Sequence, residues 1–329
     1  MILAHTFPVA EIDAPVTINQ DMKALRPVAD LAPGYLAWML RGSSGYVLSI
    51  ADESAHGTKA LRTDRLFEMQ IPLPPEREQR TIAAFLDRET ARIDALVAAK
   101  RRLIALLQEK RAALIARAVT RGLDPYAPTK DSGVAWLGRV PAHWDVMRVK
   151  HCFEFLNNRR IPLSSEERGG MERNYDYYGA SGVIDKVEAY LFDESTLLVA
   201  EDGANLLSRS TPLAFVATGR YWVNNHAHIL RPVTRSLEYW EGVLTTFDFT
   251  PLVSGSAQPK LTKEALGDMP VPAPPPTEQA SIAEAIKRWS EQIDCSVDAV
   301  NDGVKRLTEY RSTLITSAVT GRIDARAAA

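Results

Sequence analysis

The sequence predicts an α+β protein in which α/β domains alternate with two long antiparallel coiled-coil helices, arranged as an internal pseudo-twofold repeat. Three observations support this fold class. One segment recurs at an offset of 200 residues, each copy carries a heptad pattern of apolar residues, and residues 140–275 contain short apolar runs between glycine turns. A duplicated unit with a helical period and short strands indicates two related domains connected by helices.

The repeat is clearest between residues 71–124 and 271–324, where 21 of 54 positions are identical. A weaker resemblance extends toward the N-terminus at an offset of 205. The second copy has a stretch, residues 136–205, that has no counterpart in the first. The first globular segment, residues 1–75, therefore corresponds only to the later part of a domain.

Two long helices are predicted over residues 76–124 and 276–325, each after a proline cluster that suits the start of a helix but not its interior. Apolar residues then recur every seven positions, as in a coiled-coil seam of roughly 40 residues, or about 60 Å. Because a domain separates the two helices, an antiparallel pair is expected. The predicted seam residues are Leu86, Ile93, Leu107 and Leu114 in the first helix, and Ile286, Ile293, Val300, Leu307 and Leu314 in the second.

The seam has two imperfections. Lys100 occupies a seam position, and Gly303 in a helix interior costs about 1 kcal/mol relative to alanine. A second seam row is expected at the residues three positions further on, which are Leu96, Leu103, Trp289 and Tyr310. A heptad stripe alone indicates only a core or an oligomer interface.

A linker is predicted over residues 125–139 and a complete domain over residues 140–275. Strands are expected at residues 196–200, 213–216 and 221–223. Polar loops are expected at the segments that carry amide, basic or aromatic side chains, which are residues 157–160, 175–182 and 258–260. Arginine can read guanine, and asparagine or glutamine can read adenine.

Several of these residues have alternative interpretations. Tyr177 and Tyr178 are either half-buried strand residues or base contacts, and the first is favoured. His226 and His228 could begin a metal site, but without a third ligand at a suitable spacing they are better read as structural or DNA-facing residues. The acidic run of Asp193, Glu194, Glu201 and Asp202 could belong to a nuclease, yet a solvated face is favoured. No metal site is predicted.

Composition and missing motifs exclude several classes of protein. The chain lacks a phosphate-binding loop, a nucleophile elbow and a zinc-protease helix, so no catalytic residue is predicted. It has no apolar run long enough to span a membrane, no apparent signal peptide and only two isolated cysteines, which together predict a cytoplasmic protein. The net charge of −2, with 13 basic against 17 acidic residues over 140–270, argues against tight phosphate binding by this chain alone.

The ordered motifs resemble those of the specificity subunits of type I restriction–modification enzymes. The resemblance lies in residues 132–138 with 140–144, in the motifs at 177–182, 199–203 and 222–230, and in the duplicated Pro-Pro-x-x-Glu-Gln helix starts. It covers nearly the whole chain. It implies that residues 1–75 are a partial target-recognition domain, that residues 140–275 are a complete one, and that the long helices are spacers.

The resemblance also implies partners. Such subunits bind a bipartite double-stranded DNA sequence and recruit two methyltransferase subunits and two restriction–translocation subunits. S-adenosylmethionine, ATP and Mg²⁺ are then expected on those partners and not on this chain. The candidate DNA-binding residues are Asn157, Arg159, Arg160, Tyr177, Tyr178, Ser181, Arg209, His226, His228, Gln258 and Lys260 in the complete domain, with Lys59 in the partial one.

Family members carry two complete recognition domains, whereas residues 1–75 have no counterpart of the motif at 177–182. This departure puts one of the two half-site readers in doubt. The alternative function is a coiled-coil scaffold that binds methyltransferase subunits without reading a full DNA target.

Overall fold

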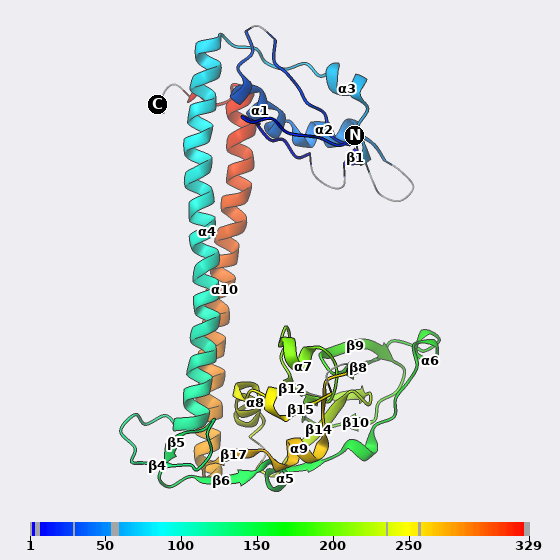
Figure 1. The fold of residues 1–329 in the computed structure, drawn as a ribbon, viewed down its shortest axis with the longest axis vertical. Coiled ribbons are helices and arrows are strands. Elements are labelled where there is room, and N and C mark those ends of the chain that lie inside the picture. The colour runs from blue at the N-terminus through cyan, green and yellow to red at the C-terminus, as the bar shows by residue number, and fades with distance from the viewer. Residues whose placement is uncertain are drawn as a thin grey trace. The chain divides into compact units, whose positions relative to one another are not determined.

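The computed structural model describes residues 2–3, 7–28, 30–53, 59–234, 236–255 and 258–325, which form two compact units (Figure 1). Unit 1 comprises residues 1–105 and 297–329, and unit 2 comprises residues 106–296. Each unit therefore combines a helix-and-sheet domain with part of each long helix.

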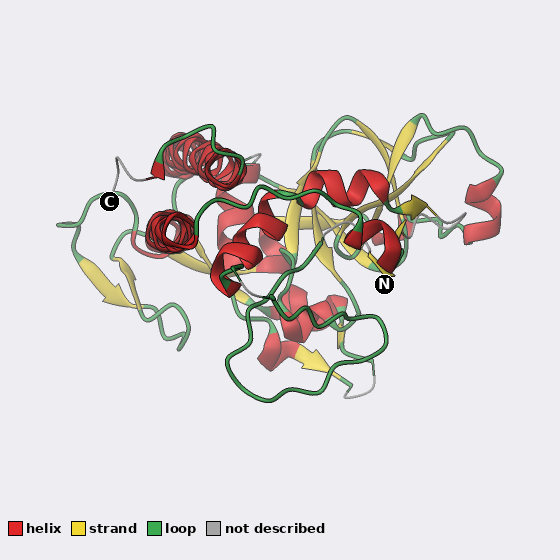
Figure 2. Ribbon diagram, turned by 90° about the horizontal axis from the view of Figure 1, so that it is seen from above, coloured by secondary structure: helices red, strands yellow, loops and turns green. Residues whose placement is uncertain are grey.

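The two predicted long helices are α4 (Glu76–Arg121) and α10 (Pro276–Val319). Figures 1 and 2 show them side by side in each unit. Both end before the predicted residues 124 and 325. A glycine with positive φ follows each helix within two residues, Gly122 at 75° and Gly321 at 72°. This left-handed conformation, which glycine adopts without strain, ends a helix.

The helices are antiparallel, and repeat-related ion pairs fix their register. In unit 1, Nε and Nη2 of Arg311 donate to the carboxylate of Asp94 at 2.9 and 3.1 Å. In unit 2, Arg111 pairs with Asp294, and its Nη2 also donates to the carbonyl oxygen of Ser290 at 3.1 Å. Each arginine thus meets the aspartate of the other repeat, so the same register holds in both units.

The main seam row lies where it was predicted. Its nine residues, from Leu86 to Leu114 and from Ile286 to Leu314, are all buried or half-buried. The predicted second row is wrong at Leu96, Leu103 and Tyr310, which are 46%, 44% and 58% exposed. The predicted row holds at Trp289, which is half-buried, and elsewhere the second row lies four residues after the first, at Val97, Ile104, Val297 and Val304, all half-buried. A seam can be flanked on either side at heptad spacing, and only the packing selects the side.

The two imperfections of the seam face each other in unit 1. A Cβ atom added to Gly303 would lie 2.9 Å from Nζ and 3.3 Å from Cε of Lys100. The glycine therefore makes room for the lysine side chain, which is too long for an ordinary seam position.

The domain of unit 1 packs short elements on the helix pair. Its core contains Tyr35, Met39 and Val47 from the domain, Leu86 from α4 and Val319 from α10. Its sheet has the strand order β1-β3-β2. The elements are β1 (Ile2–Leu3), α1 (Pro33–Gly42), α2 (Ser44–Ile50), β2 (Asp52–Glu53), β3 (Lys59–Ala60) and α3 (Thr63–Phe67).

The domain of unit 2 is built on two sheets, with strand orders β12-β11-β14-β7 and β10-β13-β8-β9. The central strand β11 is buried throughout and lies antiparallel to both neighbours. The strands are β7 (Phe153–Phe155), β8 (Tyr175–Gly179), β9 (Gly182–Val187), β10 (Phe192–Asp193), β11 (Thr196–Ala200), β12 (Ala214–Ala217), β13 (Arg220–Val223) and β14 (Ala227–Pro232).

The strands predicted at 196–200, 213–216 and 221–223 are confirmed as β11, β12 and β13, within one residue at each end. The predicted loop at 175–182 is wrong, because these residues form β8, a tight turn and the start of β9. The remaining elements of the domain are α5 (Val149–Cys152), η1 (Asn157–Arg159), α6 (Ser165–Gly169), α7 (Asn205–Ser208), α8 (Leu237–Thr246), η2 (Thr250–Leu252), β15 (Val253–Ser254), β16 (Lys260–Leu261) and α9 (Lys263–Asp268).

The predicted linker at 125–139 contains structure of its own. Strand β4 (Thr129–Asp131) pairs with β5 (Arg139–Pro141), and the chain continues into β6 (Asp145–Arg148). Strand β6 pairs with β17 (Pro270–Ala273), which leads into α10. The start of this domain is therefore fastened to its end.

The helix starts in the two repeats are held by the same contacts. Buried Gln79 donates Nε2 to the carbonyl oxygen of Pro74 at 2.8 Å, and Gln279 does the same to Pro274 at 2.9 Å. These hydrogen bonds account for the repeated glutamine position. None of the helices in the described ranges is long and apolar enough to cross a membrane.

Candidate nucleic-acid interface

A polar network gathers at the end of β11 in unit 2. Because β11 is wholly buried, the first polar residues after it, Glu201 and Asp202, are placed where the sheet meets solvent. The backbone of Glu201 bonds to two other segments: its N–H donates to the carbonyl of His226 at 2.9 Å, and its carbonyl accepts from Leu261 at 2.7 Å. Residues far apart in sequence therefore meet here.

Glu201 is the centre of this network. Its side chain is 12% exposed and accepts from Nη1 of Arg160 at 2.5 Å, while Nζ of Lys260 lies 3.4 Å from its other oxygen. Burial raises the pKa of this carboxyl group, but the hydrogen bond from Arg160 and the neighbouring positive charges outweigh burial and hold the pKa below its usual value. Glu201 is thus an anion that neutralises cations of its own domain.

Arg160 mainly stabilises this network. Its Nη1 also donates to the carbonyl oxygen of Ala227 at 2.7 Å, and its Nε donates to that of Asn157 at 3.1 Å. Its side chain is only 15% exposed. Removing it would leave the Glu201 carboxylate and a backbone carbonyl without their partner, so its first effect would be on folding.

His228 is buried in the same network. Its ring lies between Nδ2 of Asn157, 2.8 Å from Nδ1, and the carbonyl oxygen of Leu261, 2.8 Å from Nε2. Since that carbonyl can only accept, Nε2 carries the proton and Nδ1 accepts from the amide. Burial lowers the pKa of His228, which favours this neutral form. With 1% of its surface exposed, His228 is a structural residue, and the prediction that it contacts DNA is wrong for this structure.

The solvent-exposed rim of the network is formed by His226, Asp202, Gln258 and Lys260. Nδ1 of His226 lies 2.8 and 2.9 Å from the two oxygens of Asp202, and an Asn224 side chain accepts from its backbone N–H. Lys260 is 54% exposed, and Gln258 is exposed beside it. This rim presents hydrogen-bond donors and acceptors to solvent, the groups that recognise base edges. Within the described residues, no three His, Cys, Asp or Glu side chains are placed to hold a metal ion.

Arg159 belongs to a separate network. Its Nη1 donates to Glu194 at 2.9 Å, and its guanidinium lies 4.4 Å from the centre of the Phe192 ring. Glu194 also accepts two hydrogen bonds from Arg231, at 2.8 Å each. Those arginines hold the pKa of Glu194 below its usual value, with the hydrogen bond from Arg231 as the largest cause. Arg159 therefore stands apart from the rim around His226.

The tyrosines predicted to contact bases lie within the sheet. Tyr177 is 1% exposed, and its hydroxyl accepts from the backbone N–H of Leu163 at 3.0 Å, so this prediction is wrong for direct contact. Tyr178 is half-buried and stacks on Phe215 with ring centres 5.9 Å apart. Of the three candidate residues in this hairpin, Ser181, at the turn between β8 and β9, is the exposed one.

Two further candidates are placed elsewhere. Arg209 has a left-handed backbone (φ 49°), donates to the carbonyl oxygen of Phe247 at 3.2 Å and lies 3.6 Å from Asp248. Lys59 in unit 1 donates to the carbonyl oxygen of Leu48 at 3.2 Å. Neither joins the Glu201 network.

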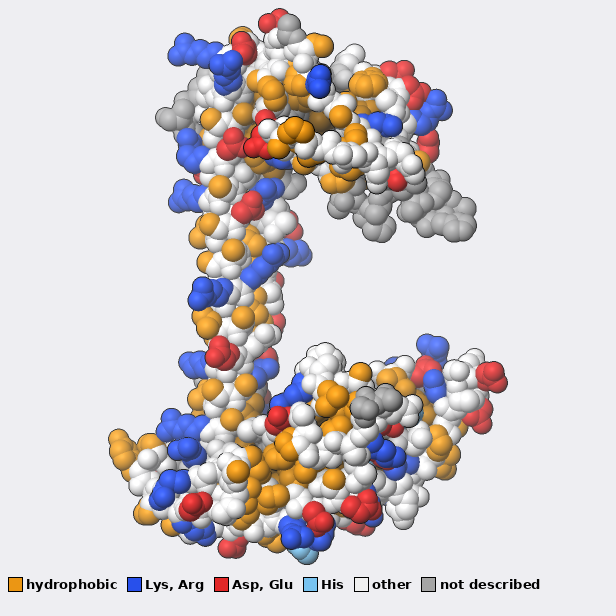
Figure 3. Space-filling view, in the orientation of Figure 1, with side chains coloured by type: hydrophobic (Ala, Val, Ile, Leu, Met, Phe, Trp, Pro, Cys, Tyr) orange, Lys and Arg blue, Asp and Glu red, His pale blue; other side chains and the backbone are white. Residues whose placement is uncertain are grey.

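The sequence did not reveal the acidic members of the site. Glu201 and Asp202 were interpreted as a solvated face, yet Glu201 is nearly buried and both hold basic partners. A signal was present, because the Glu-Asp pair directly follows the apolar run of residues 197–200 and must therefore lie at the end of that strand. Figure 3 shows the consequence on one face of this domain, where acidic and basic side chains are interspersed and form no single basic patch.

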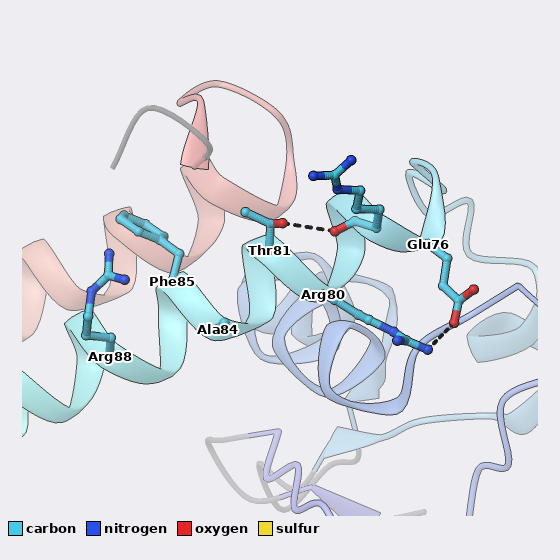
Figure 4. A pocket seen from close by; sticks show the side chains of 7 residues that line it. Glu76, Arg80, Thr81, Ala84, Phe85 and Arg88 are labelled. Atoms are coloured by element: carbon cyan, nitrogen blue, oxygen red, sulfur yellow. Dashed lines mark hydrogen bonds and ion pairs between the residues drawn. The ribbon is translucent and has the colours of Figure 1, made fainter. Parts of the chain in front are cut away.

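Unit 1 has a shallow hollow of about 500 Å³ along the first turns of α4 (Figure 4). Arg80 pairs with Glu76 at 2.5 Å, and the guanidinium of Arg88 lies 5.7 Å from the centre of the Phe85 ring. The residues that line the hollow all belong to α4, and they include three arginines and one glutamate. They contain no pair of groups arranged for acid–base or nucleophilic chemistry.

Two related copies, each joining a helix-and-sheet domain to a long helix, define an internally duplicated protein with an exposed polar rim in unit 2. The chain matches the model of the type I restriction modification DNA specificity domain over residues 2–104 and 141–305. It therefore belongs to this family.

Similar proteins carry corresponding names. A Haemophilus influenzae protein named as a type I restriction enzyme specificity subunit is 33% identical over 132 residues, covering 40% of this chain and 33% of that protein. The MjaVIII specificity subunit of Methanocaldococcus jannaschii is 22% identical over 311 residues, covering 88% and 70%. The match to the Escherichia coli EcoDI specificity subunit covers 56% of this chain and 40% of that protein. The chain thus spans a third to two fifths of two of these relatives.

A solved structure supports the fold. A chain from a study of complex assembly and conformational transition of the type I restriction–modification system superposes with a TM-score of 0.65. The alignment covers 87% of this chain and 70% of the other at 16% sequence identity. At this identity the likeness concerns the fold, which agrees with the predicted class of helix-and-sheet domains with long helices.

Proposed function

We propose that this chain is the non-catalytic DNA-recognition subunit of a type I restriction–modification complex. The observation that carries the proposal is the family match over both repeats, residues 2–104 and 141–305. In this proposal the domain of unit 2 reads one half of a bipartite sequence in double-stranded DNA. The surface that reads it is the exposed rim of His226, Gln258 and Lys260.

The charge distribution supports DNA binding in which partner subunits supply most of the phosphate contacts. Glu201 pairs with Arg160, and Glu194 pairs with Arg159 and Arg231, so these cations are already neutralised within the domain and are not available to phosphates. Phosphate contacts supply most of the non-specific affinity of DNA-binding proteins. Partner subunits would have to provide them, namely two methyltransferase subunits and two restriction–translocation subunits. S-adenosylmethionine, ATP and Mg²⁺ would bind to those partners, in the cytoplasm.

The long helix α4 offers a surface for such a partner. Leu96 and Leu103 lie one heptad apart in unit 1 and are 46% and 44% exposed, although most side chains of this size are buried. Two leucines at this spacing form an apolar stripe that a partner helix could cover.

Capture of a methyltransferase subunit tests the role of the helix. The Leu96→Glu, Leu103→Glu double variant should lose co-purification with that subunit, because two charges would enter the contact. Ala91→Glu is the matched control, since Ala91 is exposed but lies about 140° around the helix from Leu96. Equal loss in both variants would contradict the assigned surface.

Footprinting of the complex tests DNA reading and separates it from the scaffold alternative. Protection of a short specific sequence supports a reader, and capture of the subunit without protection supports a scaffold. Lys260→Ala should weaken protection of the specific sequence more than binding to unrelated DNA, because a lost base contact lowers specificity and leaves the phosphate contacts in place. Lys186→Ala is the control, because both lysines lie 3.4 Å from a carboxylate and are 53–54% exposed. The same loss from Lys186→Ala would remove Lys260 from the interface.

A further inference from the structure

Residues 69–73 of unit 1 are the repeat counterpart of residues 269–273, which form a strand pair in unit 2. There, β17 pairs antiparallel with β6, with Val271 opposite Met147 and Ala273 opposite Asp145 (Figure 1). The backbone N–H of Val149 donates to the carbonyl oxygen of Met269 at 3.0 Å in the same register. Within the described ranges, residues 69–73 have no such strand beside them.

Residues 69–73 are more exposed to solvent than residues 269–273, as expected if a strand pairs only with the second segment. In unit 2, Val271 is fully buried and Pro272 is buried. In unit 1, Ile71 is half-buried and Pro72 is exposed, and Leu73 is 60% exposed. An uncovered edge with apolar side chains is a template for pairing with another strand.

Residues 69–73 and residues 269–273 are nevertheless fixed by the same hydrogen bond from a tyrosine. The hydroxyl of Tyr35 donates to the carbonyl oxygen of Pro72 at 2.9 Å, and that of Tyr239 donates to Pro272 at 2.9 Å. Both tyrosines are fully buried. The backbone of residues 71 and 73 is therefore fixed from behind, which lowers the entropy lost when a strand binds.

The acidic residues on either side of the segment are also present in both repeats. In unit 2, Asp268 accepts from Arg148 at 2.9 Å and from Lys150 at 2.6 Å, and Glu278 lies 2.7 Å from Nε2 of His143. Of the three basic residues, His143 precedes β6, Arg148 is its last residue and Lys150 follows it. The repeat counterparts of the two acids are Glu68 and Glu78.

Glu68 is exposed, Glu78 is half-buried, and in the described part of the chain neither forms an ion pair. Glu68 and Glu78 thus lie on either side of residues 69–73. Their counterparts in the other repeat, Asp268 and Glu278, form ion pairs with basic residues.

We propose that residues 69–73 bind an extended segment of a separate polypeptide by strand addition. The partner segment has the chemistry of residues 143–150, with a histidine or cation two residues before a four-residue strand, a cation at the last residue of the strand and a second cation two residues further on. Backbone hydrogen bonds to Ile71 and Leu73 supply affinity, and Glu68 and Glu78 set direction and register.

The proposal covers the strand and its ion pairs only. In unit 2 the Trp144 side chain packs beside Gly122. Unit 1 has no equivalent packing position, because the repeat counterpart of Gly122 is Arg322. This protein contact is independent of whether the chain reads DNA.

A labelled peptide of residues 141–151, added to the full chain, tests the proposal by fluorescence anisotropy. Saturable binding is expected, weaker at high salt and absent for a scrambled peptide. Methylation of the peptide nitrogen at Met147 should abolish binding, because it removes a donor that faces the edge. Glu68→Gln and Glu78→Gln in the chain should each weaken binding about two- to fivefold, the usual effect of losing an exposed ion pair.

Asp268→Asn is the matched control, because that acid already holds cations of its own chain. Unchanged affinity in this variant supports the proposal. Three results would overturn it: no binding, equal binding of the N-methylated peptide, or loss of binding from Asp268→Asn and not from Glu68→Gln. The glutamine variants change only an exposed or half-buried carboxylate, so folding, checked by circular dichroism, should be unaffected.

Discussion

Replacing glycine by alanine should stabilise the protein at one helix position and give no stabilisation at another. Gly303 in α10 and Gly242 in α8 both lie inside helices, where alanine is favoured by about 1 kcal/mol. At Gly303 the new Cβ atom would meet only the end of the Lys100 side chain, at 2.9 Å from Nζ, and that flexible end can move. Gly303→Ala should therefore raise the free energy of unfolding by about 0.5–1 kcal/mol.

At Gly242 the same atom would meet a packed core. It would lie 3.0 Å from Cγ1 of Val119, 3.1 Å from Cγ2 of Ile115 and 3.3 Å from Cδ1 of Ile286. These branched side chains are anchored on the long helices, so relief requires a backbone shift. Overpacking of this kind costs about 1–3 kcal/mol. Gly242→Ala should lose the propensity gain and be neutral or destabilising.

Urea unfolding followed by circular dichroism at 222 nm measures both changes. Because the propensity gain is common to the two variants, the difference between them reports the packing cost alone, about 1–3 kcal/mol. A difference below about 0.5 kcal/mol would show that α8 does not approach the helix pair as closely as described. A change in the urea slope of either variant would show that unfolding is not two-state.

Two further predictions concern charge. In a double-mutant cycle of Asp94→Arg and Arg311→Asp, the reversed pair should recover about 0.5–1 kcal/mol relative to the summed single variants, whereas Asp94→Arg with Arg306→Asp should be additive. Additivity of the first pair would contradict the antiparallel register. For His228, burial lowers the pKa of the folded state below its usual 6.5, so the unfolded state takes up the proton first on acidification. Stability from this group should be complete above pH 6.5 and decline as the pH falls through that value, and His228→Gln should flatten the decline in urea titrations across pH 5–8.

The candidate site could be predicted only in part, and the reason differs between residues. The exposure of Lys260 and His226 was predictable, because their side chains are polar and their segments lack apolar periodicity. Tyr177 and His228 were misplaced, since a polar group on a strand can face either solvent or the core, and the sequence does not show which. Glu201 was missed because its role depends on Arg160 and Lys260, which come from other parts of the chain.

The sequence by itself determined the duplication, the two long helices, the central strands of the complete domain and the family. These features are periodic or local, so spacing along the chain contains them. The tertiary structure decided which residues flank the seam, why Gly303 faces Lys100, and which cations are neutralised near the candidate DNA surface. It also showed that β17 of one repeat pairs with β6, whereas no strand of the described residues lies beside residues 69–73 of the other. Such properties depend on contacts between distant segments, and no local pattern encodes which of two faces or edges a partner will occupy.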